Sequence, residues 1–145
     1  MDIYQALKED HQEAKKLFAE IEQSSGKTND SREKLFTTLK EALENHSQAE
    51  EKVFYAPLKK KEETKDKIEH AKKEHQKVTK MLNELESMDN KDDQWLKKVS
   101  QLKEDVQHHI QEEEGEIFKK AQGIFSKEQA EEMARQFKQA KKQKA

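Results

Sequence analysis

The sequence repeats one pairing of residue types, a histidine followed four residues later by a glutamate, at His46–Glu50 and at His109–Glu113. Residues i and i+4 of an α-helix lie one above the other on the same face. Each pair could therefore present an imidazole nitrogen and a carboxylate oxygen to one metal ion. Buried imidazoles and carboxylates are costly unless they are paired or bind metal. Any fold that buries both pairs must therefore supply them with partners.

Apolar residues recur every three to four positions through four long segments, which is the pattern of amphipathic helices. We expect the first helix to begin at Asp2, because Asp2 and Gln5 have the spacing of a capping box, and to end in a turn over residues 24–29. Pro57 marks the place where the second helix should bend or stop. Ser126 has the position of a cap for a shorter last helix.

These signals predict an all-α fold. We expect an antiparallel up-down-up-down four-helix bundle over about residues 2–122, followed by a short C-terminal fifth helix over about residues 126–142. The chain length fits a single domain, residues 1–145, with one core. Only 31% of the residues are hydrophobic, so the core is small and a structural metal is a candidate for additional stability.

One histidine of each long helix falls within the apolar stripe of that helix. Two of these histidines lie about ten residues after a helix start and two about ten residues before a helix end, so an antiparallel bundle places all four at one level. This convergence predicts a metal site inside the bundle. The alternative is that the histidines are core residues satisfied by their neighbours, or are solvated. The candidate metal ligands are His11, His46, Glu50, His75, His109 and Glu113.

Other histidines and glutamates lie next to these candidates. Glu51 and Glu114 follow the two paired carboxylates and could be hydrogen-bonding partners of ligands or alternative ligands. Glu114 is the stronger candidate ligand of the two, because a helix distortion near Gly115 could turn it inward. His70 and His108 point away from the apolar stripes, and we expect them on the outer face.

The candidate ligands restrict the kind of metal. The chain has no cysteine, which excludes thiolate-bound zinc and iron–sulfur clusters. Mixed nitrogen and oxygen donors suit iron, manganese or zinc. Zinc takes four ligands in most sites, whereas six donors with carboxylates that can bridge fit a pair of metals better. We therefore expect two Fe ions, with Mn or Zn as the weaker alternatives.

Composition restricts the partners. Charged residues make up 41% of the chain, but the formal net charge is only -2, which argues against a nucleic-acid partner. The Lys-rich tail over residues 138–144 is interpreted as a solvated helix end. Neither a secretory signal pattern nor an apolar run of about 20 residues is present, so we expect a cytoplasmic protein without a membrane partner.

The motifs resemble those of a known family. They are Asp10-His11, His46-x-x-x-Glu50-Glu51 followed by Val53-Phe54-Tyr55, Glu74-His75, and His109-x-x-x-Glu113-Glu114 followed by Ile117-Phe118. In order and spacing they resemble the hemerythrin family, in its HHE cation-binding branch, over about residues 3–120. The resemblance implies an antiparallel four-helix bundle around a non-haem di-iron centre, bridged by carboxylates and an oxo or hydroxo group.

The sequence also departs from the oxygen carriers of that family. The carriers have a His-x-x-x-His pair in the third helix, whereas the position four residues before His75 is Ala71 in this chain. The carriers place a carboxylate five residues after the last ligand histidine, which is Glu114, whereas HHE relatives use the four-residue step, Glu113. By this resemblance, one iron has fewer nitrogen donors, or water in place of an imidazole.

Three functions are compatible with these observations, and we favour the first over the second and the second over the third. The first is a binding protein whose di-iron site senses, stores or buffers oxygen, nitric oxide or iron without turnover. We expect this protein to be a monomer. The second is an enzyme that reduces oxygen or peroxide, or relieves nitrosative stress, at an open coordination position. The third is a metal-free interaction bundle whose histidines are incidental.

Overall fold

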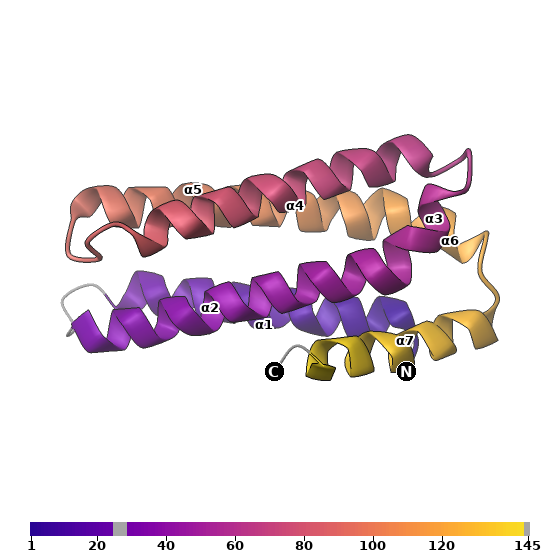
Figure 1. Cartoon of the computed structure of the whole chain (residues 1–145), viewed down its shortest axis with the longest axis horizontal. Helices are drawn as coiled ribbons and strands as arrows, with labels where there is room; N and C mark the ends of the chain where they lie inside the picture. The colour runs from indigo at the N-terminus through magenta and orange to yellow at the C-terminus, as the bar shows by residue number, and fades with distance from the viewer. Residues whose placement is uncertain (25–28, 144–145) are drawn as a thin grey trace.

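The computed structural model describes residues 1–24 and 29–143 of the chain, and within them the secondary structure is helical (Figure 1). Four long helices are joined by short connections, and two of them continue through a π-helical turn into a short helix. In chain order the elements are α1 (Ile3–Gln23), α2 (Asn29–Glu50), the π-helical turn η1 (Glu51–Tyr55), α3 (Ala56–Lys59), α4 (Lys65–Glu86), α5 (Asp93–Glu112), the π-helical turn η2 (Glu113–Ile117), α6 (Phe118–Gln122) and α7 (Lys127–Gln143).

The predicted helix starts are confirmed by reciprocal hydrogen bonds. The backbone N–H of Gln5 donates to the Asp2 carboxylate at 2.9 Å, and the Asp2 N–H donates to the Gln5 side chain at 3.1 Å. Ser126 and Gln129 make the same pair of bonds before α7, at 3.1 and 2.8 Å. These bonds satisfy backbone donors that have no partner within the helix. Most of the turn predicted over residues 24–29 lies outside the described residues.

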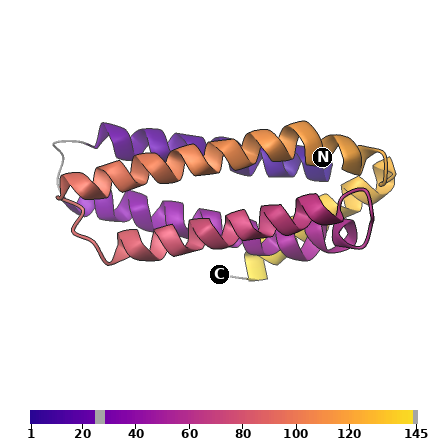
Figure 2. The ribbon, with the colours of Figure 1, turned by 90° about the horizontal axis from the view of Figure 1, so that it is seen from above.

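The four long helices form the predicted antiparallel bundle. Helices α1 and α2 pack against each other, as do α4 and α5, and the two pairs meet through α1 with α5 and α2 with α4. Figure 2 shows the four helices running lengthwise, with the turns at the two ends. The fifth helix, α7, folds back along α1 and α2. Within the described residues, no helix is long and apolar enough to cross a membrane.

Two π-helical turns interrupt the bundle helices directly after Glu50 and Glu112. A π-helical turn holds one residue more than an α-helical turn, so the following side chains rotate by about 100° relative to a continuous α-helix. Near Gly115 the predicted distortion is therefore present. Near Pro57 the helix stops, as one of the two predicted outcomes: a π turn lies just before the proline, and the helix ends at Lys59.

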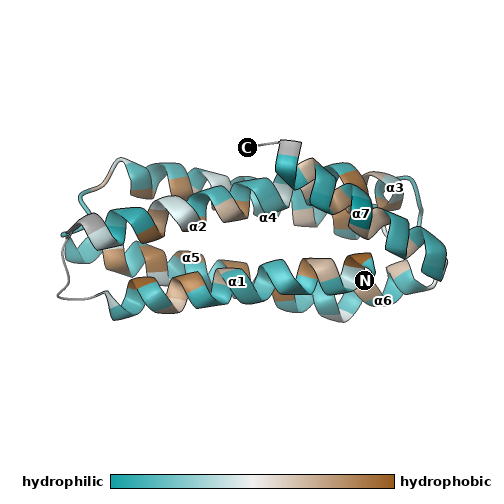
Figure 3. Ribbon diagram, turned by 90° about the horizontal axis from the view of Figure 1, so that it is seen from below, coloured by the Kyte–Doolittle hydropathy of each residue, from teal (hydrophilic) through white to brown (hydrophobic). Residues whose placement is uncertain are grey.

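The apolar core has two parts, with a polar layer between them. One cluster fills the end of the bundle covered by α7 and includes Leu7, Phe54 and Phe137. The other fills the opposite end and includes Phe18 and Trp95. Hydrophobic and hydrophilic residues both recur along the long helices, as expected of amphipathic helices (Figure 3). The candidate ligand histidines and glutamates lie between the two clusters.

The Lys-rich tail differs from the prediction at one position. Lys142 is exposed, as expected of a solvated helix end, and residue 144 lies outside the described part of the chain. Lys141, in contrast, is only partly exposed, and its ammonium group lies 2.7 and 2.8 Å from the two carboxylate oxygens of Asp10. The packing of α7 against α1 brings these groups together, which the sequence pattern of α7 alone does not show.

Candidate metal centre

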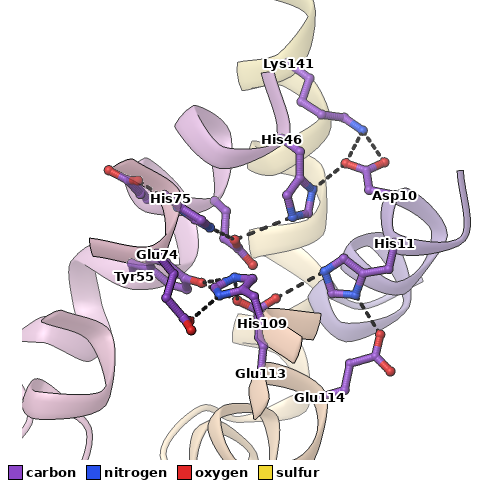
Figure 4. A network of polar contacts seen from close by, with 12 residues as sticks. Asp10, His11, His46, Tyr55, Glu74, His75, His109, Glu113, Glu114 and Lys141 are labelled. Carbon is purple, nitrogen blue, oxygen red and sulfur yellow. Dashed lines mark hydrogen bonds and ion pairs between the residues drawn. The ribbon is translucent and has the colours of Figure 1, made fainter. Parts of the chain in front are cut away.

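All six predicted ligands converge inside the bundle (Figure 4). The side chains come from α1, α2, η2, α4 and α5, and each of them is buried: the four histidines are 3–8% exposed, and Glu50 and Glu113 are fully enclosed. The prediction that the four histidines lie at one level of the bundle is therefore correct. Six ionisable side chains in one enclosed layer need partners, because a buried charge without a partner is strongly destabilising.

Each histidine is oriented from outside by a carboxylate of a neighbouring segment. In all four cases the Nδ1 atom contacts the carboxylate, so a neutral imidazole donates from Nδ1–H and turns its Nε2 lone pair inward. This is the orientation that a metal ion in the centre requires. The contacts are His11–Glu114 at 2.6 Å, His46–Asp10 at 2.8 Å, His75–Glu51 at 2.8 Å and His109–Glu74 at 2.7 Å.

The two buried glutamates lie between histidines of different helix pairs. Glu50 Oε1 lies 3.5 Å from Nε2 of His46 on the same helix and 3.2 Å from Nε2 of His75 on α4. Glu113 spans the bundle in the same way, with one oxygen 3.3 Å from Nε2 of His11 and the other 3.5 Å from Nε2 of His109. Each carboxylate therefore connects the α1–α2 pair of helices with the α4–α5 pair.

Several of these atoms have no hydrogen bond within the described residues. They are one nitrogen and three oxygens facing the centre: His11 Nε2, both carboxylate oxygens of Glu50, and Glu113 Oε1. Leaving buried acceptors unpaired costs free energy, and a metal ion that accepts their lone pairs removes this cost. The residues present therefore fit a bound metal.

Two groups of donors could each hold one ion. His11, His46, Glu50 and Glu113 form the first group, and Glu50 forms the second with His75 and His109. Within each group, one donor atom per residue lies within 4.8 Å of the others. Glu50 belongs to both groups, which is the position of a carboxylate that bridges two ions.

The charges at the site perturb the pKa values strongly. Burial alone lowers the pKa of His46, but Glu50 and Asp10 outweigh it and raise this pKa to about 10. His109 is affected in the same way: burial lowers its pKa, but Glu113 and Glu74 outweigh burial and raise this pKa to about 10. Against the effect of burial, the nearby imidazoles of His109 and His11 hold the pKa of Glu113 well below its usual range. Without metal, the folded site therefore favours the protonated imidazoles of His46 and His109 and the ionised carboxylate of Glu113.

Among the flanking candidates, Glu51 and Glu114 occupy equivalent places, each contacting the outward Nδ1 of a histidine. The π turn at Gly115 is present, but it directs Glu114 to His11 rather than into the centre. Of the two roles considered for Glu114, the structure therefore favours that of a hydrogen-bonding partner. His70 and His108 lie on the outer face as predicted, with side chains 63% and 65% exposed.

The sequence reasoning missed the role of Tyr55. Tyr55 is buried on η1, its hydroxyl donates a hydrogen bond to Glu113 Oε2, and its ring stacks on His75 at 5.3 Å between centroids. Burial and the neighbouring Glu113 and Glu50 raise its pKa well above the usual value, so the hydroxyl stays protonated at neutral pH. An α-helical continuation of α2 gave no reason to place this side chain at the site.

The roles of Asp10 and Glu74 were also missed, although a signal was present. An acidic residue directly precedes His11 and His75, and another directly follows each paired glutamate. These adjacent residues point about 100° away on the helix, toward the neighbouring helix rather than the centre. Partners that orient metal-binding histidines occupy such places. Acidic residues next to the candidate ligands in the sequence therefore form a second pattern, that of the histidine-orienting partners.

An apolar cavity of about 260 Å³ adjoins the four histidines on the side of the second core cluster. Its apolar walls include Leu43, Val78, Val106 and Ile110, and it is also lined by the charged residues Asp10, Glu13 and Lys141. A cavity with mainly apolar walls accommodates small ligands of low polarity beside the histidines.

Comparison with known proteins agrees with this geometry. The family model described as the hemerythrin HHE cation-binding domain matches residues 2–121. An uncharacterised hemerythrin-like protein of Schizosaccharomyces pombe is 34% identical over 102 residues, which are 69% of this chain and 50% of that protein. A protein of Nostoc sp. named DNA nickase is 27% identical over 143 residues, which are 97% of this chain and 39% of that protein. The chain therefore spans half or less of the length of these curated relatives.

A solved structure has the same fold. The crystal structure of a hemerythrin HHE cation-binding-domain protein from Mycobacterium kansasii superposes with a TM-score of 0.84 at 22% sequence identity, covering 99% of this chain and 86% of the other. The similarity extends over almost the whole chain, α7 included.

Proposed function

The chain belongs to the hemerythrin HHE cation-binding family, and we propose that it is a non-haem di-iron protein that binds or senses oxygen or nitric oxide inside the bundle. The sharing of Glu50 between two donor groups is the observation that carries the proposal. One ion would be held by His11, His46 and the two glutamates, and the other by Glu50, His75 and His109. Iron suits these nitrogen and oxygen donors and supplies reversible redox chemistry when bound.

The surroundings favour binding of a small ligand of low polarity. The cavity adjoins all four histidines, and most of the surface of its walls is apolar. The histidines are fixed by their outer carboxylates, so the inward Nε2 atoms need no reorganisation when metal or ligand binds. Diatomic oxygen and nitric oxide fit within this space and match the low polarity of most of its walls.

One observation favours a second candidate function, the reduction of oxygen or peroxide. Such a reaction consumes protons as well as electrons. The Tyr55 hydroxyl keeps its proton at neutral pH and lies on Glu113, next to both histidines of the second donor group. A hydroxyl that keeps its proton at this place can donate a hydrogen bond to a bound oxygen species during turnover. A separate reductant must then restore the ferrous ions.

Metal analysis tests the proposal. Protein reconstituted with ferrous iron under anaerobic conditions should hold two irons per chain, and its near-ultraviolet absorption after exposure to air should bleach with dithionite. His46→Ala should hold at least one iron fewer, while the exposed His108→Ala should keep both. If the protein takes up no metal under these conditions, the proposal is wrong and the metal-free bundle is the correct interpretation.

Ligand binding and turnover are then separated by titration. Reversible spectral changes with oxygen or nitric oxide, without consumption of a reductant, support the binding protein. Repeated consumption of peroxide with an added reductant supports the enzyme, and Tyr55→Phe should then reduce the rate while leaving the iron content unchanged.

A further inference from the structure

A second set of metal-binding side chains lies on the outer face, between α4 and α5. His70 and Glu74 are four residues apart on α4, and His108 and Glu112 are four residues apart on α5. The exterior thus repeats the His-x-x-x-Glu spacing of the buried site. His70 Nε2 lies 3.4 Å from Glu74 Oε2 and 3.7 Å from Glu112 Oε2, and these three residues offer one donor atom each within 4.8 Å of one another.

Glu74 connects this outer group with the buried site. Its Oε1 lies 2.7 Å from Nδ1 of His109, while its Oε2 faces His70. Figure 4 shows Glu74 reaching the His109 ring from outside. At the corresponding place on the other side of the bundle, Asp10 is occupied by the ammonium group of Lys141. Glu74 has the exposed imidazole of His70 in place of a lysine, which leaves room for a metal cation.

A cavity leads inward from the outer group. It has a volume of about 240 Å³ and is lined at the surface by His70 and Glu112 and inside by His109 and Glu113. Glu113 is fully buried, and its Oε1 makes no hydrogen bond to the part of the chain that the structure describes. Ala71 is in the cavity wall. A small side chain at this position leaves the passage open.

The charges along this cavity attract cations. Its lining includes five carboxylates and one lysine, and that lysine, Lys67, is paired with Glu116. A cleft lined by one sign of charge concentrates ions of the opposite sign and raises their rate of association. The cavity on the other side of the histidines has mainly apolar walls and lacks this attraction. The two cavities therefore suit different molecules, one a small ligand of low polarity and the other a metal ion.

We propose that His70, Glu74 and Glu112 form an acquisition site for a divalent first-row transition metal, from which the ion passes beside Ala71 to His109 and Glu113. This inference rests on the proposed function, since the ion needs a buried destination. One imidazole and two carboxylates are suitable ligands for ferrous iron, manganese or zinc. Their partial exposure leaves coordination positions to water, so the ion binds more weakly here than inside and is released inward.

Binding at the outer site is tested separately from loading of the buried one. We would add Mn²⁺ to the metal-free protein and follow the ring resonances of His70 and His108 by NMR. These resonances should broaden at Mn²⁺ concentrations that leave the amide resonances of α7 unchanged, and Glu112→Gln should weaken the effect. Equal broadening over the whole surface would overturn the outer site.

Passage through the cavity is tested by the rate of loading. Co²⁺ uptake by the metal-free protein is followed through its visible absorption, which reports ions held by several histidines. The variant with both His70→Ala and Glu112→Gln should load about tenfold more slowly and reach the same final cobalt content, because only the electrostatic and ligand guidance is lost. Glu44→Gln, at the mouth of a different cavity that reaches His75, is the matched control and should load at the normal rate.

Ala71→Leu distinguishes a passage from an unrelated surface site. It should narrow the cavity and slow Co²⁺ uptake, while Mn²⁺ still broadens His70 and His108. Unchanged uptake rates in both the surface variant and Ala71→Leu, or an equal decrease in Glu44→Gln, would overturn the passage. If the unaltered protein takes up no Co²⁺ inside, the proposed function fails instead, and the Mn²⁺ experiment still decides whether the outer site exists.

Discussion

The two halves of the bundle hold similar ligands in different surroundings. In the α1–α2 half, His11 and His46 are oriented by Glu114 and Asp10. In the α4–α5 half, His75 and His109 are oriented by Glu51 and Glu74, and Glu50 belongs to the donor groups of both halves. The outer partners differ, because Asp10 binds Lys141 of α7, whereas Glu74 faces the exposed His70.

The aromatic side chains differ as well. Phe118 lies parallel to the His11 ring at 6.5 Å between centroids, and Tyr55 lies parallel to the His75 ring at 5.3 Å. Only the second of these rings carries a hydroxyl, and that hydroxyl binds Glu113. Equal spacing of the candidate ligands therefore does not make the surroundings of the two halves equal. One position is shielded by α7, and the other has a hydroxyl donor and a route to the surface.

The largest effect is expected from removing Glu50, the carboxylate that the two halves share. Because Glu50 belongs to both donor groups, Glu50→Ala should lower the iron content by at least one ion per chain. Glu41→Ala, an exposed change on the same helix, should keep two irons and serves as the control. The iron content is measured by elemental analysis after anaerobic reconstitution. Two irons in the Glu50 variant would show that the halves bind metal independently of this carboxylate.

The second prediction concerns pH, and the halves should respond alike. Without metal, the pKa values of His46 and His109 are about 10, against about 6.5 in an unfolded chain. The folded state therefore holds these protons more tightly. The free energy of unfolding of the metal-free protein should be largest below about pH 6.5 and decrease as the pH rises toward 10. Denaturant titrations between pH 6 and 10 measure this dependence.

Metal binding should show the opposite trend, because the ion replaces the protons on Nε2. Iron or cobalt uptake should release protons and become tighter as the pH rises over the same range. Histidine NMR titrations of the metal-free protein test whether the halves are equivalent. A difference of more than about one pKa unit between His46 and His109 would break the electrostatic similarity of the two halves.

The third prediction concerns a substitution that makes the two halves more alike. Tyr55→Phe removes the hydroxyl on Glu113 and should lower the free energy of unfolding of the metal-free protein by about 1–3 kcal/mol, since a buried carboxylate loses a donor. Tyr4→Phe is the matched control. The Tyr4 hydroxyl is buried and has no hydrogen-bond partner among the described residues, so this change should be neutral or stabilising. Equal effects of the two changes in denaturant titrations would refute the role assigned to Tyr55.

The smallest effect is expected in the α1–α2 half, which α7 covers. Lys141→Met removes the ion pair with Asp10 and should cost less than about 1 kcal/mol, because both side chains are partly exposed. Amide hydrogen exchange should accelerate in the last turns of α7 and remain unchanged in α4. Lys142→Met, at the exposed neighbouring position, should do neither. Faster exchange in both halves would contradict the assignment of Lys141 to the α1–α2 half alone.

Much of the fold and the ligand set could be predicted from the sequence. The capping residues Asp2 and Ser126 indicated where helices begin, and the apolar periodicity indicated how many there are. The spacing of His46 and Glu50 placed both on one helix face. The roles of Tyr55 and Lys141 could not be predicted, because the π turn rotates the first and the packing of α7 on α1 brings the second to Asp10.

By itself, then, the sequence determined which donors exist, on which helix face each lies and at what level they meet. These are local properties, since a helix repeats every 3.6 residues and rises by a fixed distance per residue. The tertiary structure decided which carboxylate orients each histidine, that Glu50 and Glu113 connect the two halves, and that one half opens to the surface beside Ala71. Such contacts depend on how the helices are rotated and offset relative to one another. That arrangement is fixed only when side chains distant in sequence pack together.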